Sequence, residues 1–416
     1  MRPSRHDLLT LAALLLLSLA GCATTPPQPA AAAPPPLLLI SIDGLRPADV
    51  TAEAMPHLSR LADGGVRADG MRPSYPSLTF PNHYTLVTGL RPDRHGIVHN
   101  AMHDAALGEF RLSNREAVGD GRWWGGEPVW IGVRRAGKRS ATLFWPGSEA
   151  AIAGVRPDRW QPYDDTMPVD QRVDTVAGWL LEPASTRPHF ATLYFERVDT
   201  DSHHHGPDSA EAADARRDVD AAIGRLVHAL ATRGALDAIN IVVVSDHGLA
   251  DVPAGNVVAI EDMASADEAR IDAIGQVVML APKPGFEALL ETRLLGRGRH
   301  HECWRKRDLP ERWHYGSHPR IPAIVCQMDE GWDALPKSVI ARRGAAGTRG
   351  SHGYDPELAS MRATFIAHGP AFRAGSRLPV FDNVDVYPLL MRLLDVPPAP
   401  NDGDIAPLLP ALRSMP

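Results

Sequence analysis

Leu37-Leu38-Leu39-Ile40-Ser41-Ile42-Asp43-Gly44 is the stretch that decides the fold, a continuous apolar run that ends in an aspartate and a glycine. The same pattern returns in Ile241-Val242-Val243-Val244-Ser245, which is followed by Asp246-His247-Gly248. A third apolar run covers residues 189–195 and is followed by Glu196 and Asp199. Continuous apolar runs are typical of strands that are buried on both faces, as in parallel sheets. The sequence therefore predicts three such strands, each with a carboxylate near its carboxyl end.

Helical patterns lie between these predicted strands. In the clearest one, residues 214–233, apolar side chains recur at helical spacing, and Gly234 follows where a C-terminal cap belongs. Strands that alternate with helices predict an α/β fold with a mostly parallel central sheet flanked by helices. Residues from about 250 to 345 differ, because they include Cys303 and Cys326 and many charged and aromatic residues. We expect a smaller inserted subdomain there.

The N-terminus has the pattern of an export signal. Arg2 and Arg5 precede the apolar residues 8–19, a run too short to span a membrane. A basic start, a short apolar core and small residues at its end predict a secretory signal. Leu19-Ala20-Gly21-Cys22 resembles a bacterial lipobox, so we expect cleavage before Cys22 and lipidation of its thiol. A plain secretory signal that is cut elsewhere is the alternative.

The lipobox implies a simple domain organisation. Residues 1–21 are the predicted signal peptide, and residues 22–36, rich in Ala and Pro, form a semi-rigid tether. Residues 37–416 form the predicted folded domain. We expect an exported protein that faces the periplasm of a bacterium and contacts the membrane only through the lipid anchor on Cys22.

The composition excludes several classes of function. The chain of 416 residues has a formal net charge of −7, which argues against nucleic-acid polymers as partners, because their binding depends on neutralisation of phosphates by Lys and Arg. Only three cysteines exclude a disulfide scaffold or a thiolate zinc finger, whereas 18 histidines leave room for a His/carboxylate metal site. With Cys22 lipidated and the compartment oxidising, we expect a disulfide between Cys303 and Cys326; two buried free thiols are the alternative.

Acidic and histidine residues gather at the predicted strand ends. Asp199 and His203 are four residues apart, so on a helical turn they share one face. The candidate ligands are Asp43, Asp199, His203, Asp246, His247 and His352. Mixed Asp and His ligands suit Zn²⁺, and six exceed the needs of one tetrahedral ion. We therefore predict two ions, which can clamp the attacking and leaving oxygens of a phosphoryl transfer.

Taken singly, each of these residues has a simpler interpretation. An aspartate after a strand is commonly a turn residue or a helix cap. His352 lies in the glycine-rich loop 350–353 and could be a surface or hydrogen-bonded histidine. The neighbouring His204 and His205 leave the choice of His203 as a ligand open.

A candidate nucleophile is Thr79, in the segment Ser77-Leu78-Thr79-Phe80-Pro81-Asn82-His83. Pro81 favours the first turn of a helix, which would place Thr79 at a helix N-terminus. Free backbone N–H groups and the helix dipole favour an anion at that position. A hydroxyl bound to a metal there is activated through a lowered pKa. The alternative is a threonine that only caps the helix.

Together, these residues resemble a known family, the nucleotide pyrophosphatase/phosphodiesterases of the alkaline phosphatase superfamily. The resemblance covers nearly the whole chain after the tether, and the long motif around Thr79 is its most specific part. The motifs are Ser41-Ile42-Asp43-Gly44, Thr79-Phe80-Pro81-Asn82-His83-Tyr84-Thr85-Leu86-Val87-Thr88-Gly89, Gly96-Ile97-Val98-His99-Asn100, Phe144-Trp145-Pro146-Gly147, residues 199–207, Ser245-Asp246-His247-Gly248 and Ser351-His352-Gly353-Tyr354.

The resemblance implies a role for each residue. Thr79 resembles the nucleophile that forms a phosphothreonine. The implied ligands of one zinc are Asp43, Thr79, Asp246 and His247, and those of the other are Asp199, His203 and His352. Asn100 matches an asparagine that hydrogen-bonds a phosphate oxygen. Phe80 and Tyr163 match aromatic residues that hold the nucleobase, and Tyr194 could line the same pocket; ordinary packing is the alternative for these three rings.

The resemblance implies zinc-dependent hydrolysis of nucleotide phosphodiester or pyrophosphate bonds with release of a nucleoside monophosphate. The alternatives on the same two-metal site are a phosphomonoesterase, a phosphonate hydrolase and a lysophospholipid or choline-phosphodiester hydrolase. A sulfatase is disfavoured because it needs a Cys or Ser where this chain has Thr79. A metal-binding lipoprotein without catalysis is a further alternative. The chain resembles a stand-alone catalytic domain, and its sequence does not predict an oligomeric state.

Overall fold

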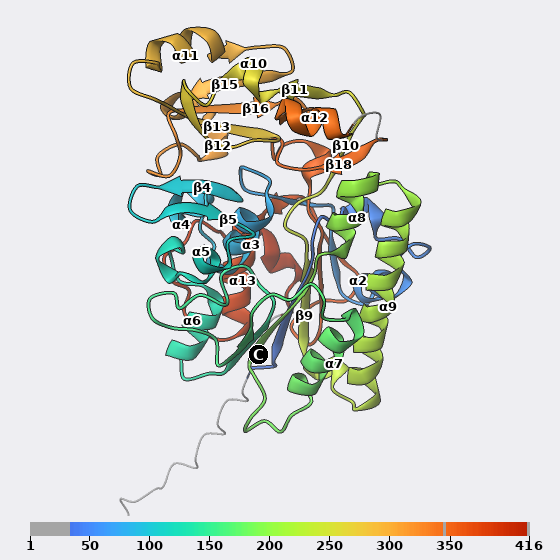
Figure 1. Cartoon of the computed structure of the whole chain (residues 1–416). Helices are drawn as coiled ribbons and strands as arrows, with labels where there is room; N and C mark the ends of the chain where they lie inside the picture. Colours follow the sequence, from blue (N-terminus) through green and yellow to red (C-terminus); the bar gives the residue numbers. More distant parts are fainter. Residues whose placement is uncertain (1–33, 344–346, 414–416) are drawn as a thin grey trace, which may run out of the picture. The chain divides into compact units, whose positions relative to one another are not determined.

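The computed structural model describes residues 34–343 and 347–413 (Figure 1). The predicted signal peptide, Cys22 and most of the tether lie outside these residues. From Pro35 onward the chain forms one compact unit. None of the helices in the described part combines the length and the apolar character that a membrane crossing requires.

An eight-stranded sheet forms the centre of the fold. Its strand order is β20-β2-β19-β9-β1-β8-β6-β7, and only β19 runs antiparallel to its neighbours. The strands are β1 (Leu37–Ile42), β2 (Val66–Ala68), β6 (Ser140–Leu143), β7 (Arg159–Gln161), β8 (Phe190–Phe195), β9 (Asn240–Val244), β19 (Phe365–His368) and β20 (Ser376–Leu378). The mostly parallel sheet predicted from the sequence is thus confirmed, and the three apolar runs form its adjacent strands β9, β1 and β8.

Both faces of this sheet are buried, which explains the unbroken apolar runs. Side chains alternate along β1, so that Leu37 and Leu39 enter one core while Leu38 and Ile40 enter the other. In β9, Val242 likewise belongs to the first of these cores. A strand between two apolar layers carries no polar face, and its sequence therefore shows no alternation.

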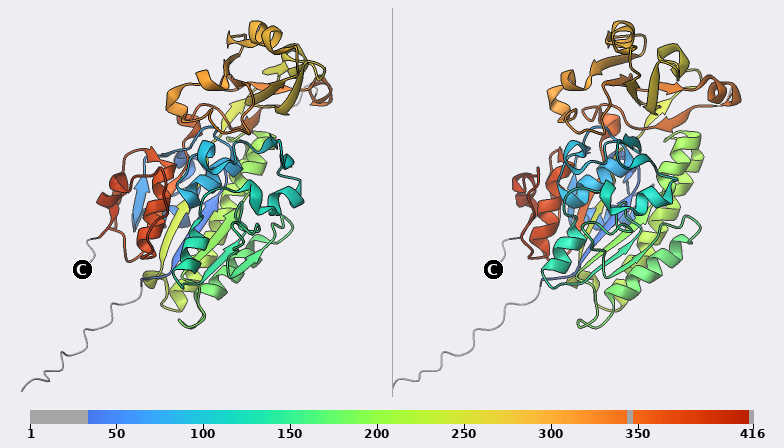
Figure 2. Two further views of the ribbon diagram at one scale, coloured as in Figure 1. Left: turned by 90° about the vertical axis from the view of Figure 1, so that its left-hand side faces the viewer. Right: turned by 60° about the vertical axis from the view of Figure 1, so that its left-hand side comes forward.

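Helices cover the two faces (Figure 1, Figure 2). One face is covered by α2 (Pro56–Asp63), α7 (Val169–Leu180), α8 (Arg197–His205) and α9 (Ala210–Thr232), and the other by α3 (Thr79–Thr88), α6 (Val129–Arg135) and α13 (Val386–Leu393). The predicted helix over residues 214–233 corresponds to α9. It begins earlier than predicted because the Ser209 side chain accepts a hydrogen bond from the Ala212 N–H.

A second sheet lies between β9 and β19 in the chain. It is antiparallel, in the order β12-β13-β16-β15-β14, with β12 (Ala269–Ala273), β13 (Val277–Pro282), β14 (Gly296–Arg297), β15 (His301–Arg305) and β16 (Ile324–Met328). Cys303 and Cys326 face each other on β15 and β16, and the expected disulfide joins them. At the base of this segment β10 (Ala250–Val252) pairs with β18 (Arg349–Ser351).

Smaller elements complete the fold. The short helices are α4 (Pro92–His95), α5 (Arg115–Gly119), α10 (Ile260–Met263), α11 (Glu287–Leu294) and α12 (Lys337–Arg343). The remaining paired strands are β3 (Met71–Arg72) with β21 (Phe381–Asp382), β4 (Ala101–Asp104) with β5 (Gly108–Arg111), and β11 (Val257–Ala259) with β17 (Asp333–Leu335).

Candidate metal centre and adjoining cleft

The carboxyl ends of three adjacent parallel strands place the candidate ligands. Asp43 directly follows β1, Asp246 and His247 follow β9, and Asp199 lies in the first turn of α8, which follows β8. Because β9, β1 and β8 are neighbours, residues from distant parts of the chain meet at one edge of the sheet. The structure thus brings all six candidate ligands together, in two groups of three.

The first group, here called the strand-end group, consists of Asp43, Asp246 and His247. One ligand atom from each residue lies within 4.8 Å of the others. The Nε2 atom of His247 is 3.0 Å from Asp246 Oδ2 and 3.6 Å from Asp43 Oδ1. All three side chains are buried.

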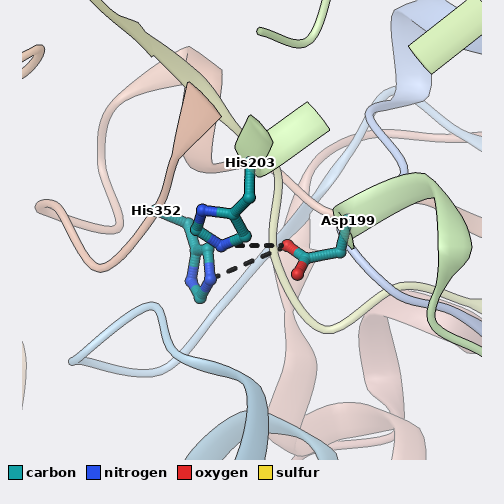
Figure 3. A group of neighbouring side chains, drawn as sticks. All are labelled: Asp199, His203 and His352. Atoms are coloured by element: carbon teal, nitrogen blue, oxygen red, sulfur yellow. Dashed lines mark ion pairs between the residues drawn. The ribbon is translucent and has the colours of Figure 1, made fainter. Parts of the chain in front are cut away.

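The second group, here called the helix–loop group, consists of Asp199, His203 and His352 (Figure 3). Asp199 and His203 lie one turn apart on α8, as their spacing predicts, and His352 follows β18. The Nε2 atoms of His203 and His352 are 3.5 Å and 3.7 Å from Asp199 Oδ1. The rings of His247 and His352 stack with centroids 3.5 Å apart, so the two groups are adjacent.

The three histidines present the same ring nitrogen to the carboxylates. Each Nδ1–H donates to a backbone carbonyl: His203 to Gly350 at 3.0 Å, His247 to Gly248 at 3.0 Å, and His352 to Ser77 at 2.9 Å. A carbonyl can only accept, so in the neutral ring the hydrogen is on Nδ1 and a lone pair is on Nε2. Metal-binding histidines are commonly oriented in this way.

The buried carboxylates of the two groups also favour a bound cation. Asp43 Oδ1, Asp199 Oδ1 and Asp246 Oδ2 are buried and have no hydrogen-bond partner of good geometry. Each of these oxygens faces an Nε2 lone pair. Buried acceptors that face one another are costly unless a positive charge lies between them. The residues therefore fit a metal, and the described part of the chain offers two sets of three possible ligands.

Burial and charge shift the acidity of these groups. Burial and the charges of Asp246 and Asp199 raise the pKa of the Asp43 carboxyl well above its ordinary value. Burial lowers the pKa of His203 and His352, which favours the neutral form of both rings. Burial would also lower the pKa of His247, but the carboxylate of Asp246 outweighs it and raises that pKa. A cluster of carboxylates and neutral imidazoles is the ligand set that a divalent cation requires.

Thr79 is the first residue of α3, as Pro81 predicts, and its Oγ1 lies 3.3 Å from His247 Nε2. The expectation of free N–H groups at this helix end needs correction. The Phe80 N–H donates to Asn100 Oδ1 at 2.9 Å, and Pro81 has no N–H. Asn100 therefore caps the helix with its carbonyl oxygen, which leaves its amide N–H₂ group to donate elsewhere.

A cleft of about 800 Å³ opens beside these groups. Thr79, Asp43 and Asp199 contribute to its wall, together with the predicted aromatic residues Phe80, Tyr163 and Tyr194. Asn100 is not among the residues that line it.

The sequence did not reveal several contacts of this site. The Tyr194 hydroxyl donates to Asp43 Oδ2 at 2.6 Å, so this ring also orients a candidate ligand. His83 contacts Asp246 behind the strand-end group. Arg115 and Glu149 form an ion pair in the cleft wall. His83 belongs to the motif around Thr79, which was the available signal, whereas no pattern in the sequence marks Arg115 or Glu149.

Known proteins are similar to this chain in both sequence and fold. Residues 37–355 match the family described as "Type I phosphodiesterase / nucleotide pyrophosphatase". The chain is 34% identical to ectonucleotide pyrophosphatase/phosphodiesterase family member 3 of Bos taurus and 35% identical to the venom phosphodiesterase CdcPDE of Crotalus durissus collilineatus, over 383 residues each. These matches cover 88% of this chain but 42% and 45% of the relatives, so the chain spans less than half of their length.

The fold is similar to that of murine ectonucleotide pyrophosphatase/phosphodiesterase 5, solved as an inactive threonine-to-alanine variant in complex with AMP. The TM-score is 0.85 at 31% sequence identity, and the match covers 91% of this chain and 100% of that chain. The human counterpart gives the same values. With its alkaline-phosphatase-like α/β fold and a family match that covers most of its length, the chain belongs to the type I phosphodiesterase/nucleotide pyrophosphatase family.

Proposed function

We propose that this protein is a zinc-dependent hydrolase of nucleotide phosphodiester and pyrophosphate bonds that acts through a phosphothreonine and releases a nucleoside monophosphate. One observation carries the proposal: the Thr79 hydroxyl lies beside His247 at a cleft whose wall includes ligands from both groups and the ring of Phe80. A nucleophile, two cation sites and an aromatic wall in one cleft suit a nucleotide diester. AMP in the structure of the murine relative is consistent with such a substrate.

Zinc would be held by two ligand sets. The strand-end group with Thr79 Oγ1 would hold one ion, and the helix–loop group would hold the other. When bound, the ions supply positive charge that lowers the pKa of the threonine hydroxyl and stabilises the negative oxygens of the transferring phosphoryl group.

The residues of the chain then perform two displacements at phosphorus. Thr79 Oγ attacks the phosphorus, a new P–O bond forms, the bond to the leaving oxygen breaks, and the hydroxyl proton ends on that leaving oxygen. Water next attacks the phosphothreonine, the P–Oγ bond breaks, and a proton from this water passes to the threonine oxygen as the monophosphate departs. In this proposal the Asn100 amide donates to a non-bridging oxygen, while Phe80 and Tyr163 hold the base and Tyr194 completes the pocket.

The charge of the cleft favours diesters over monoesters. A monoester dianion calls for an additional cation near the phosphate, which the neutral amide of Asn100 does not supply. Arg72 and Arg91 pair with Asp382, and Arg94 pairs with Asp402. Among the described residues that line the cleft the arginine is Arg115, and its guanidinium pairs with Glu149.

The deciding experiment compares p-nitrophenyl esters on the zinc-loaded domain. We expect the thymidine monophosphate ester to have a kcat/KM far above those of p-nitrophenyl phosphate and p-nitrophenyl phosphorylcholine. Preference for the monoester would indicate a phosphomonoesterase, and preference for phosphorylcholine would indicate a lipid-type diesterase. Absence of turnover with all three would contradict the proposed function.

We also propose that the protein is exported and anchored. The signal-like residues 1–21 and the lipobox cysteine Cys22 support this, and the chain's relatives include venom enzymes and ectoenzymes. Metabolic labelling with a fatty-acid analogue should modify the wild-type protein but not a Cys22→Ser variant. A wild-type protein that takes up no label would contradict the proposed lipid anchor on Cys22.

A further inference from the structure

A buried histidine behind the strand-end group has no part in the proposed displacements. His83 lies on α3 one turn after Thr79, and its side chain is fully buried. Its Nδ1 lies 2.9 Å from the Thr79 carbonyl oxygen and 3.2 Å from Asp246 Oδ2. Its Nε2 lies 2.8 Å from Ser41 Oγ. The ring therefore stands between the backbone of the proposed nucleophile and a proposed metal ligand.

The partners of this ring fix its tautomer. Both oxygens near Nδ1 are acceptors, one a carbonyl and the other a carboxylate, so Nδ1 carries the hydrogen. In the neutral ring Nε2 then accepts, and the hydrogen must come from the Ser41 hydroxyl. Ser41 is fully buried, and its hydroxyl has no second hydrogen-bond partner among the described residues. Without that hydroxyl the buried Nε2 lone pair would lose its donor, and the ring would lose its hydrogen bond on that side.

Neighbouring rings hold the imidazole in its plane. Trp145 and Tyr194 pack edge-on against His83, with centroids 5.2 Å and 5.3 Å away. The Trp145 indole N–H donates to the His83 carbonyl at 3.0 Å. Tyr194 in turn holds Asp43 through its hydroxyl. The ring is thus confined on several sides, and its N–H direction is set by the tautomer.

We propose that Ser41 and His83 are positioning residues for the strand-end group. The Ser41 hydroxyl donates to Nε2 and anchors the His83 ring, and the Nδ1–H of that ring holds the first turn of α3 at Thr79 in place beside the Asp246 carboxylate. The assignment rests on the proposed function, which makes Thr79 the nucleophile and Asp246 a ligand. The residues that orient metal ligands typically change metal affinity or activity by about 10- to 100-fold when they are removed.

A matched pair of hydroxyl deletions tests this role. Thr85, on the same helix, lies 3.1 Å from Nε2 of the buried His95 and contacts no candidate ligand. Ser41→Ala should lower zinc affinity and kcat by about 10- to 100-fold with little change in KM. Thr85→Val should destabilise the fold to a similar degree but leave zinc affinity and kcat within about threefold. Zinc affinity is measured by chelator competition without substrate.

A second variant separates anchoring of the ring from simple packing. In His83→Asn the side-chain amide can donate from near the Nδ1 position, and it has no ring Nε2 for the Ser41 hydroxyl to anchor. We expect this variant to retain most of the zinc affinity, and Ser41→Ala to have little further effect in its background. Such a double-mutant cycle isolates the coupling between the two residues.

Two results would overturn the proposal. One is a Ser41→Ala variant that matches Thr85→Val in zinc affinity and kcat, and the other is a Ser41→Ala loss that persists in full in the His83→Asn background. Failure of the proposed function would show differently, because the wild-type protein would then cleave none of the test esters.

Discussion

The strand-end group and the helix–loop group use the same ligand types but are held in different ways. Side chains of the strand-end group are 0–2% exposed, whereas those of the helix–loop group are 6–31% exposed. The first group follows two neighbouring strands, β1 and β9, whose register is fixed by a hydrogen-bond ladder. The second combines one turn of α8 with the segment after β18, which lies about 150 residues further along the chain.

The hydrogen bonds that hold the carboxylates in place also differ between the two groups, and they favour the strand-end group. Asp43 receives a hydrogen bond from Tyr194, and Asp246 receives one from the Gly44 N–H at 3.2 Å. The Oδ1 atom of Asp199 has no hydrogen-bond partner among the described residues. Burial and fixed partners preorganise ligands and exclude water. We therefore expect the strand-end group to hold its ion more tightly than the helix–loop group.

The largest effect is expected at Thr79, whose hydroxyl lies beside His247 of the strand-end group. Thr79→Ala removes the proposed nucleophile and should lower turnover of the nucleotide ester by roughly 10³-fold or more. The fold should persist, since a methyl group fits where the threonine stood. Zinc analysis and circular dichroism serve as controls. A folded, zinc-loaded variant with wild-type turnover would show that the chemistry does not depend on this hydroxyl.

Stepwise chelation and the removal of one histidine from each group should distinguish the two ions. Stepwise chelation is expected to remove zinc in two phases, because the more exposed helix–loop group should bind its ion at least about tenfold more weakly. His203→Ala should abolish the early phase and leave the late one, and His247→Ala should do the reverse. Zinc content and residual activity are followed together. A single ion with full activity, or a reversed order, would contradict the comparison.

A smaller effect is expected from the support of Asp43. Tyr194→Phe removes a hydrogen bond to a charged group, which is worth about 1.5–3 kcal/mol, so zinc affinity of the strand-end group should fall by roughly tenfold or more. Tyr315→Phe is the matched control, because its buried hydroxyl donates to the Val98 carbonyl at 2.9 Å and lies outside the two ligand groups. Equal zinc affinities in the two variants would remove Tyr194 from the support of the metal centre.

The sequence predicted one group more completely than the other. Unbroken apolar runs mark strands buried on both faces, so Asp43 and Asp246 could be placed at one edge of the sheet. The approach of His352 depends on how β18 returns to β10, and no local pattern encodes that pairing. The Tyr194 bond to Asp43 depends on the register that pairs Ser41 with Tyr194 across β1 and β8. Register is a property of the assembled sheet, and a single strand does not reveal it.

The antiparallel strands also could not be predicted from local sequence patterns. β19 is four residues long and lies among parallel strands, so its direction follows from the chain's path rather than from its composition. The second sheet uses short strands such as β14, which has only two residues. By contrast, the start of α3 at Thr79 was predictable, because Pro81 restricts the backbone locally.

The smallest effect on the metal centre is expected from the disulfide, although it lies in the segment between His247 and His352 along the chain. Cys303→Ala with Cys326→Ala opens a loop with a sequence separation of 23 residues, which should cost about 3 kcal/mol of unfolding free energy in the chain-entropy model. The base of the segment stays paired through β10 and β18, so His352 should keep its place. Thermal unfolding should therefore shift while zinc stoichiometry and kcat stay within about twofold. If the double variant instead lost the weakly held ion, the helix–loop group would depend on the second sheet, and its greater exposure alone would no longer explain the difference between the groups.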